Sequence, residues 1–262
     1  MSTAKPIAPS PSARLKGRNI LAVASGKGGV GKTWFSITLA QALSKAGMKT
    51  LLFDGDLGLA NLDIQLGLMP KHDLGSVIGG RISLDQAVQH FDEGGFDVVA
   101  GRSGSGGLSN LAPSRLGMLG EELSLLATGY DKVIIDLGAG VEKSVRQLTG
   151  QAASCVVLVT DEPTSLTDAY AFIKVTRMDR PGADIKIVVN MANSVKEGEK
   201  TFNTLKKACE GFLKFTPGLL GIVRRDTKVP DTIRHQAPIL IRHPNAEAAQ
   251  DVEKIAKELA KD

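Results

Sequence analysis

The sequence has 262 residues, of which 42% are hydrophobic and 23% charged, and its net charge is +4. This length is near the upper end for one domain and allows a substantial core, while the weak positive charge allows a nucleic-acid partner without arguing for one. The two cysteines, Cys155 and Cys209, form no C-x-x-C pair, so we expect no structural zinc. The sequence shows neither an apolar run of ~18 residues nor a signal-peptide core, so the expected location is cytoplasmic.

The chain begins with residues 1–17, which are rich in proline, glycine and small polar residues and lack periodicity. This composition predicts a flexible tail, followed by one domain over residues 18–262. Apolar runs then recur along the chain, at 19–25, 49–54, 96–101, 132–137, 155–160, 185–190 and 219–223. Each run is continuous rather than alternating, as in strands that are covered on both faces.

Helical patterns separate these runs, for example at 33–47 and 165–178. Alternating strands and helices predict an α/β fold with a single doubly wound, mostly parallel sheet of seven or eight strands and helices on both faces. At the end of the chain, an apolar stripe at helical spacing includes Val252 and Leu259, while the polar face mixes Glu and Lys. This pattern favours a helix docked on the core over a membrane-surface helix.

The stretch ASGKGGVGKTWF, residues 24–35, joins the first predicted strand to the first predicted helix. It fits the dinucleotide pattern G-x-G-x-x-G through Gly26, Gly28 and Gly31, and Asp54 at the end of the second strand suits that interpretation. It also fits the phosphate-loop pattern G-x-x-x-x-G-K-T, which adds Lys32 and Thr33. A triphosphate needs an ammonium for its β- and γ-phosphates and a hydroxyl for Mg²⁺, so the sequence favours the phosphate loop.

A second carboxylate follows another apolar run, KVIIDLGAG, in which Asp136 ends the predicted strand. A carboxylate at this place holds the Mg²⁺ shell in triphosphate sites, and the glycines after it let the backbone approach the phosphates. The sequence therefore predicts that the site binds a nucleoside triphosphate and Mg²⁺.

Lys27 follows the first glycine and completes K-G-G-x-G-K-[ST], which resembles the deviant Walker A loop of the MinD/ParA class of ATPases. The resemblance implies an ATP-bound homodimer in which Lys27 reaches the partner's phosphates and acts as an arginine finger does. The segment FDGDLGLANLD, residues 53–63, resembles the MinD branch rather than the ParA type. It implies that Asp56 is the switch carboxylate, which positions the attacking water, with Asp54 in support and Asn61 and Asp63 in the switch.

The segment at residues 161–174 resembles the flagellar FlhG/FleN type. The resemblance as a whole covers about residues 18–260. It implies that Glu162 lies near the nucleotide across the dimer, that Asn190 reads the adenine edge with its amide, and that the segment from Arg224 lines the base. The implied catalytic residues are Lys27, Lys32 and Asp56, and the implied metal ligands are Thr33, Asp56 and Asp136. The implied ATP-binding residues are Gly26, Lys27, Gly28, Gly29, Val30, Gly31, Lys32, Thr33, Trp34, Glu162, Asn190, Arg224, Arg225 and Asp226.

Two positions depart from the family pattern. Trp34 stands where a small hydroxyl residue is usual, and Gly138 stands where proline is usual. The first has no functional explanation in the sequence, and the second is expected to loosen the loop after Asp136 and to change the hydrolysis rate.

The resemblance implies a weak, partner-regulated ATPase that acts as a switch in placing flagella or the division site, through a flagellar or division protein as partner. A second hypothesis is a partition ATPase whose ATP-bound dimer holds DNA nonspecifically, through a basic face at Arg224, Arg225, Lys228, Arg234 and Arg242. Membrane binding has little support in the last helix. An iron–sulfur carrier of related scaffold is disfavoured because a C-terminal C-x-x-C is missing.

Overall fold

The structure is a computed structural model that describes residues 17–101 and 111–261. Its strands are β1 (Ile20–Ser25), β2 (Thr50–Gly55), β3 (Gln89–Phe91), β4 (Phe96–Val99), β5 (Lys132–Ala139), β6 (Ser154–Val159), β7 (Asp184–Ala192) and β8 (Gly218–Arg224). Its helices are α2 (Lys32–Lys45), α3 (Leu62–Leu66), α4 (Leu74–Ile78), α5 (Pro113–Leu126), α6 (Lys143–Thr149), α7 (Pro163–Asp179), α8 (Val195–Ala208), α9 (Lys228–Arg234), α10 (Ile239–Arg242) and α11 (Glu247–Leu259). The predicted tail lies outside the described residues except for Gly17.

The strands form one eight-stranded sheet in the order β3-β4-β2-β5-β1-β6-β7-β8. Every pairing is parallel except that of β3 with β4. Each apolar run of the sequence becomes a strand, which confirms the predicted fold. The strand β3 was not predicted, because it has only three residues and lies at the edge of the sheet.

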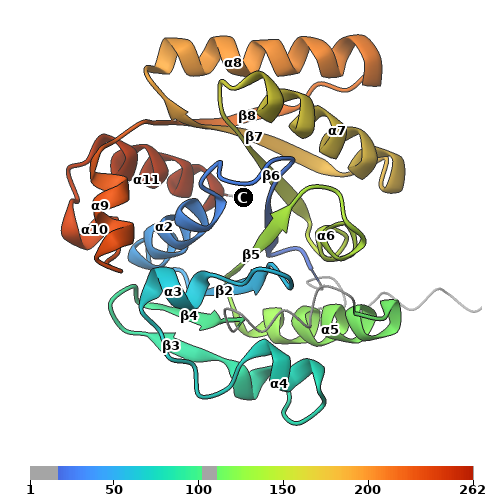
Figure 1. Ribbon diagram of the computed structural model, residues 1–262, viewed down its shortest axis with the longest axis vertical. Helices are drawn as coiled ribbons and strands as arrows, with labels where there is room; N and C mark the ends of the chain where they lie inside the picture. Colours follow the sequence, from blue (N-terminus) through green and yellow to red (C-terminus); the bar gives the residue numbers. More distant parts are fainter. Residues whose placement is uncertain (1–16, 102–110, 262) are drawn as a thin grey trace, which may run out of the picture.

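Helices cover both faces of the sheet (Figure 1). One face packs against α2, α10 and α11 through buried side chains such as Phe35, Leu240 and Val252. The other face packs against α5, α6, α7 and α8 through side chains such as Leu123 and Phe172. Burial on both faces explains why the strand sequences are continuously apolar. In the part of the chain that the structure describes, no helix is long and apolar enough to cross a membrane.

The last helix, α11, packs against α2 and β8 (Figure 1). The predicted apolar stripe is buried, with exposed fractions of 3% or less at Val252, Ile255, Ala256 and Leu259. Ile255 also fills the space beside Gly221, where an added Cβ would lie 2.4 Å from the Ile255 side chain. The interpretation of this segment as a core helix is confirmed.

We expect Ile255→Ala to lower the free energy of unfolding by about 2–5 kcal/mol, because it removes buried methyl groups and leaves a cavity beside Gly221. Lys257→Ala on the exposed side of the same helix is the control and should change stability little. Chemical denaturation of both variants provides the measurement. Equal stability of the two variants would contradict the packing of α11.

Candidate functional site

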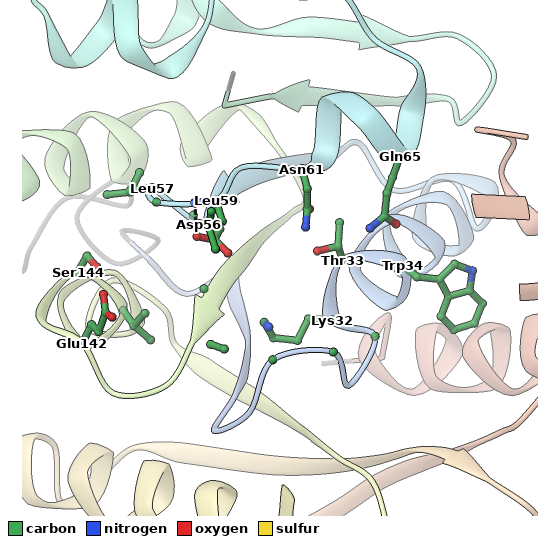
Figure 2. Close-up of a pocket in the computed structure, with 18 of the residues that line it drawn as sticks. Lys32, Thr33, Trp34, Asp56, Leu57, Leu59, Asn61, Gln65, Glu142 and Ser144 are labelled. Atoms are coloured by element: carbon green, nitrogen blue, oxygen red, sulfur yellow. Dashed lines mark hydrogen bonds between the residues drawn. The ribbon is translucent and has the colours of Figure 1, made fainter. Parts of the chain in front are cut away.

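The candidate site lies where the carboxyl ends of β1, β2 and β5 meet, which is the usual place for ligands in open parallel sheets. A cavity of about 690 Å³ opens there. Figure 2 shows Lys32 and Thr33 on one side of it and Asp56 on the other, with Glu142 and Ser144 further along. The cavity draws its walls from five sequence regions: residues 28–34, 55–65, 138–145, Met191 and Ile233.

The phosphate loop connects β1 to α2, and two of its glycines are fixed by geometry. A Cβ at Gly26 would lie 2.1 Å from a backbone atom of Asp168, so only glycine lets the loop pass this close to α7. Gly31 precedes α2 with φ of 86°, a left-handed conformation that glycine adopts without strain. The first amides of α2 then face the cavity, and the first turn of this helix contains no acidic residue. This arrangement favours the binding of anions.

Lys32 and Thr33 form the first turn of α2, so both predicted phosphate and metal contacts line the cavity. Burial lowers the pKa of the Lys32 ammonium, and the charges of Asp136 and Asp56 act in the opposite direction. The Thr33 hydroxyl and the Ser36 hydroxyl both hydrogen-bond to the Asp136 carboxylate, the latter at 2.9 Å. Thus a cation, a hydroxyl and carboxylates converge on the same end of the cavity.

Two buried carboxylates lie side by side behind this end, because Asp54 and Asp136 occupy paired positions of β2 and β5. Burial, and then the nearby Asp136 charge, raises the pKa of Asp54 to about 8. Burial also raises the pKa of Asp136 to about 6, against the hydrogen bond from Thr33 and the charge of Lys32. The nearby Lys32 ammonium does not balance the negative charge that these carboxylates can carry, so a divalent cation suits the cluster.

Mg²⁺ takes oxygen ligands and usually keeps several waters beside one or two carboxylates and a phosphate. The oxygen donors here are the Thr33 hydroxyl and the carboxylates of Asp56 and Asp136, so the donor set fits this ion. Asp136 and Asp54 are almost fully buried, while Asp56 is only partly buried and lines the cavity. Asp56 is therefore the carboxylate with the most direct access to a bound ligand.

The loop after β2 fixes Asp56 by two backbone contacts. The Asp56 amide donates to Asp54 Oδ1 at 3.2 Å, and Asp56 Oδ1 accepts from the Leu59 amide at 2.9 Å. Gly138 lies opposite, and a Cβ at this position would come within 3.3 Å of Asp56 Oδ1. The departure from proline at Gly138 thus leaves room for the Asp56 carboxylate.

Lys27 does not line the cavity. Its ammonium makes an ion pair with Glu162, just before α7, and a 3.0 Å hydrogen bond with the Thr164 hydroxyl. This ion pair lowers the pKa of the Glu162 carboxyl, and the charge of Arg225 acts in the same direction. The two lysines of the loop therefore have different surroundings: Lys32 faces its own cavity and Lys27 lies outside it, with 37% of its side chain exposed.

The predicted adenine residues lie outside the residues that line the cavity. Asn190 is buried, and its amide nitrogen donates to the Val30 carbonyl at 2.8 Å, so it supports the phosphate loop from β7. Arg224 pairs with Asp251 and Glu247 of α11, and Asp226 accepts from the Ala248 amide at 3.4 Å. The Arg225 amide donates to the Ala192 carbonyl at 2.8 Å. Their contact with adenine stays a prediction.

Other residues that sequence reasoning did not name form part of the cavity wall: Gln65, Glu142, Met191 and Ile233. Met191 directly follows Asn190 and has φ of 57°, which is uncommon for a residue other than glycine. The irregular pairing of β7 and β8 near this residue accompanies that conformation. A backbone conformation of this kind leaves no mark in the sequence, so only the position of Met191 directly after Asn190 could have indicated it.

Comparison with known proteins agrees with this geometry. The nucleotide-binding domain family described as CobQ/CobB/MinD/ParA matches residues 21–239. The chain belongs to this family. The antiactivator FleN of Pseudomonas aeruginosa is 35% identical over 92% of this chain and 85% of its own, and the flagellum site-determining protein YlxH of Helicobacter pylori is 30% identical over 90% and 80%. The cell division ATPase MinD of Pyrococcus furiosus superposes with a TM-score of 0.80 at 25% identity, over 94% of this chain and 99% of that one.

Membership in the CobQ/CobB/MinD/ParA family confirms the resemblance that the loop with Lys27 and the segment 53–63 indicated. The matched region contains the phosphate loop and Asp56, Asp136, Glu162 and Asn190. It extends to Ile239, at the start of α10. The chain thus has a nucleotide-binding domain of this family, and the cavity lies at its phosphate loop.

We expect the thermal stability of the protein without nucleotide or Mg²⁺ to fall as the pH rises toward 8. The pKa of Asp54 is about 8 in the folded chain and about 3.9 when unfolded, so in that interval the folded state binds a proton that the unfolded state lacks. Each rise in pH therefore favours unfolding. Asp54→Asn cannot ionise and should flatten the fall, as measured by Tm between pH 5.5 and 8.5.

The control for this series is Asp85→Asn, because Asp85 is an exposed aspartate far along the chain from the site. It should retain the wild-type dependence of Tm on pH. If Asp54→Asn keeps the full wild-type slope of Tm against pH, Asp54 is not the titrating group.

Proposed function

We propose that this protein is a Mg²⁺-dependent ATPase that dimerises with bound ATP and acts as a switch in placing flagella or the division site. The observation that carries the proposal is the different placement of the two loop lysines. Lys32 faces the cavity beside Asp56 and Asp136, while Lys27 lies outside it, partly exposed and bonded to the exposed Glu162 carboxylate and the Thr164 hydroxyl. A cation in that place is available to a second nucleotide.

In this mechanism Lys32 neutralises the β- and γ-phosphates of its own nucleotide, and the amides of the phosphate loop bind them. Thr33 and Asp56 would hold Mg²⁺ with Asp136 behind them, and Mg²⁺ would offset charge on the phosphates. Asp56 also positions the attacking water. Hydrolysis to ADP and phosphate then removes the γ-phosphate that the dimer requires.

Lys27 serves the partner's nucleotide in this proposal. Its ammonium must exchange the Glu162 carboxylate for phosphate, and Glu162 would remain close to the shared interface. Because Glu162 is exposed, its release to water carries little penalty, and a bound triphosphate offers the ammonium a higher negative charge. The cation would then stabilise charge on the transferred phosphoryl group.

The cellular role in the proposal rests on the relatives. FleN is named an antiactivator, and its match covers 92% of this chain. YlxH is named a flagellum site-determining protein, and its match covers 90%. A regulatory flagellar or division protein is therefore the expected partner. The DNA-partition alternative relied on five basic residues, and two of them, Arg224 and Arg242, make ion pairs with Asp251 and Asp231 within the chain.

Three substitutions separate the roles. Lys32→Ala should weaken ATP binding, because it removes the cation of its own site. Lys27→Ala should bind ATP almost normally but lose dimerisation and hydrolysis together. Asp56→Ala should lose hydrolysis and accumulate the ATP-bound dimer. The measurements are ATP binding, mass by light scattering and phosphate release.

Lys174→Ala on the exposed side of α7 is the matched control and should behave as the unsubstituted protein. A Lys27→Ala protein that dimerises and hydrolyses ATP at the normal rate would exclude the shared-nucleotide mechanism. Capture of binding partners with the Asp56→Ala dimer tests the cellular role. A flagellar or division protein supports the switch, and DNA supports partition.

A further inference from the structure

Trp34 is the only tryptophan of the chain and belongs to the first turn of α2, next to Lys32 and Thr33. Its side chain is 6% exposed, and its indole Nε1–H has no hydrogen-bond partner among the described residues. A buried donor without an acceptor is costly, and such groups in folded proteins need an explanation. The proposed phosphate chemistry does not use this indole.

Trp34 borders two spaces. It lines the large cavity, and it also lines a cavity of about 20 Å³ whose other walls include Thr232, Ala237 and Pro238 of the segment around α9. Gln65 of α3 and Ile233 of α9 line both spaces as well. In Figure 2 the indole lies on the side of α2 away from Lys32, and Gln65 points from α3 toward the turn with Thr33 and Trp34.

The helix α3 directly follows the loop that holds Asp56 and Asn61, and both of these side chains line the cavity. On its other side, α3 is attached to the segment after α9, because Gln236 Nε2 donates to the Ile64 carbonyl at 2.7 Å. Any shift of the loop around Asp56 that moves α3 must therefore change the surroundings of the indole or move α9 with it.

We propose that Trp34 is a positioning residue that couples α9 to the movement of α3 with the γ-phosphate state. Trp34 lines both cavities together with Gln65 and Ile233, and its free Nε1–H takes or leaves a partner as α3 moves with the switch loop. This inference rests on the proposed function, since it requires a nucleotide in the large cavity. A residue that only fills the core would have the same surroundings with ADP and with ATP.

The test uses the intrinsic fluorescence of the full chain, which arises mainly from this one indole. Equilibrium dialysis with labelled nucleotide first establishes how much ADP or non-hydrolysable ATP analogue is bound with Mg²⁺. At equal occupancy, we expect the emission of Trp34 to differ between the two nucleotides. Trp34→Phe should abolish the signal and reduce kcat several-fold with little change in KM, because it retains an aromatic ring but not the Nε1–H.

Gln65→Ala should reduce the ADP–ATP difference in emission several-fold while the protein still binds nucleotide by dialysis. Gln250→Ala, an exposed glutamine of α11, is the control and should keep the difference. Identical emission with both nucleotides at proven occupancy would overturn this inference alone. Absence of bound nucleotide in dialysis would overturn the proposed function and this inference together.

Discussion

The structure depends on two carboxylates that the sheet holds next to each other. Parallel pairing of β2 with β5 puts Asp54 beside Asp136 at the end where the phosphate loop also emerges. Neither carboxylate can move away, because both belong to buried strands. The positive end of α2, the Lys32 ammonium and the hydroxyls of Thr33 and Ser36 all face this concentration of acid. A bound metal–phosphate ligand would offset the negative charge that remains.

The phosphate loop is attached to α7 as well as to α2. Gly26 approaches the α7 backbone too closely for any side chain, and Lys27 bonds to Glu162 and Thr164 at the start of the same helix. From the opposite side, Asn190 bonds to the Val30 carbonyl. The loop is therefore held by β7 and α7, so the backbone that surrounds the phosphate position is formed before a ligand arrives.

The sequence predicted those parts of the site that depend on local pattern. The order of strands and glycines around Lys32 and Thr33, and the carboxylate at the end of the 132–137 run, need only chain neighbours to be recognised. Asn190 and Arg224 were assigned to the adenine site from the family alone, and the structure shows each side chain bonded to a distant partner, Val30 or Asp251. Such partners are set by tertiary packing. The same holds for Gln65 and Ile233, which approach Trp34 only after the chain folds.

Two glycines of the phosphate loop, Gly26 and Gly28, differ in what an added side chain would meet. Position 26 is excluded from carrying a side chain by the protein itself, since α7 occupies the space. Position 28 has nothing within 4 Å of an added Cβ and no left-handed φ, so an alanine there meets no obstacle until a phosphate arrives. In a library of loop variants, residues at 26 would be selected for cellular abundance, whereas residues at 28 would be selected only for ligand affinity. Gly26 and Gly28 of one motif are thus under separate evolutionary constraints.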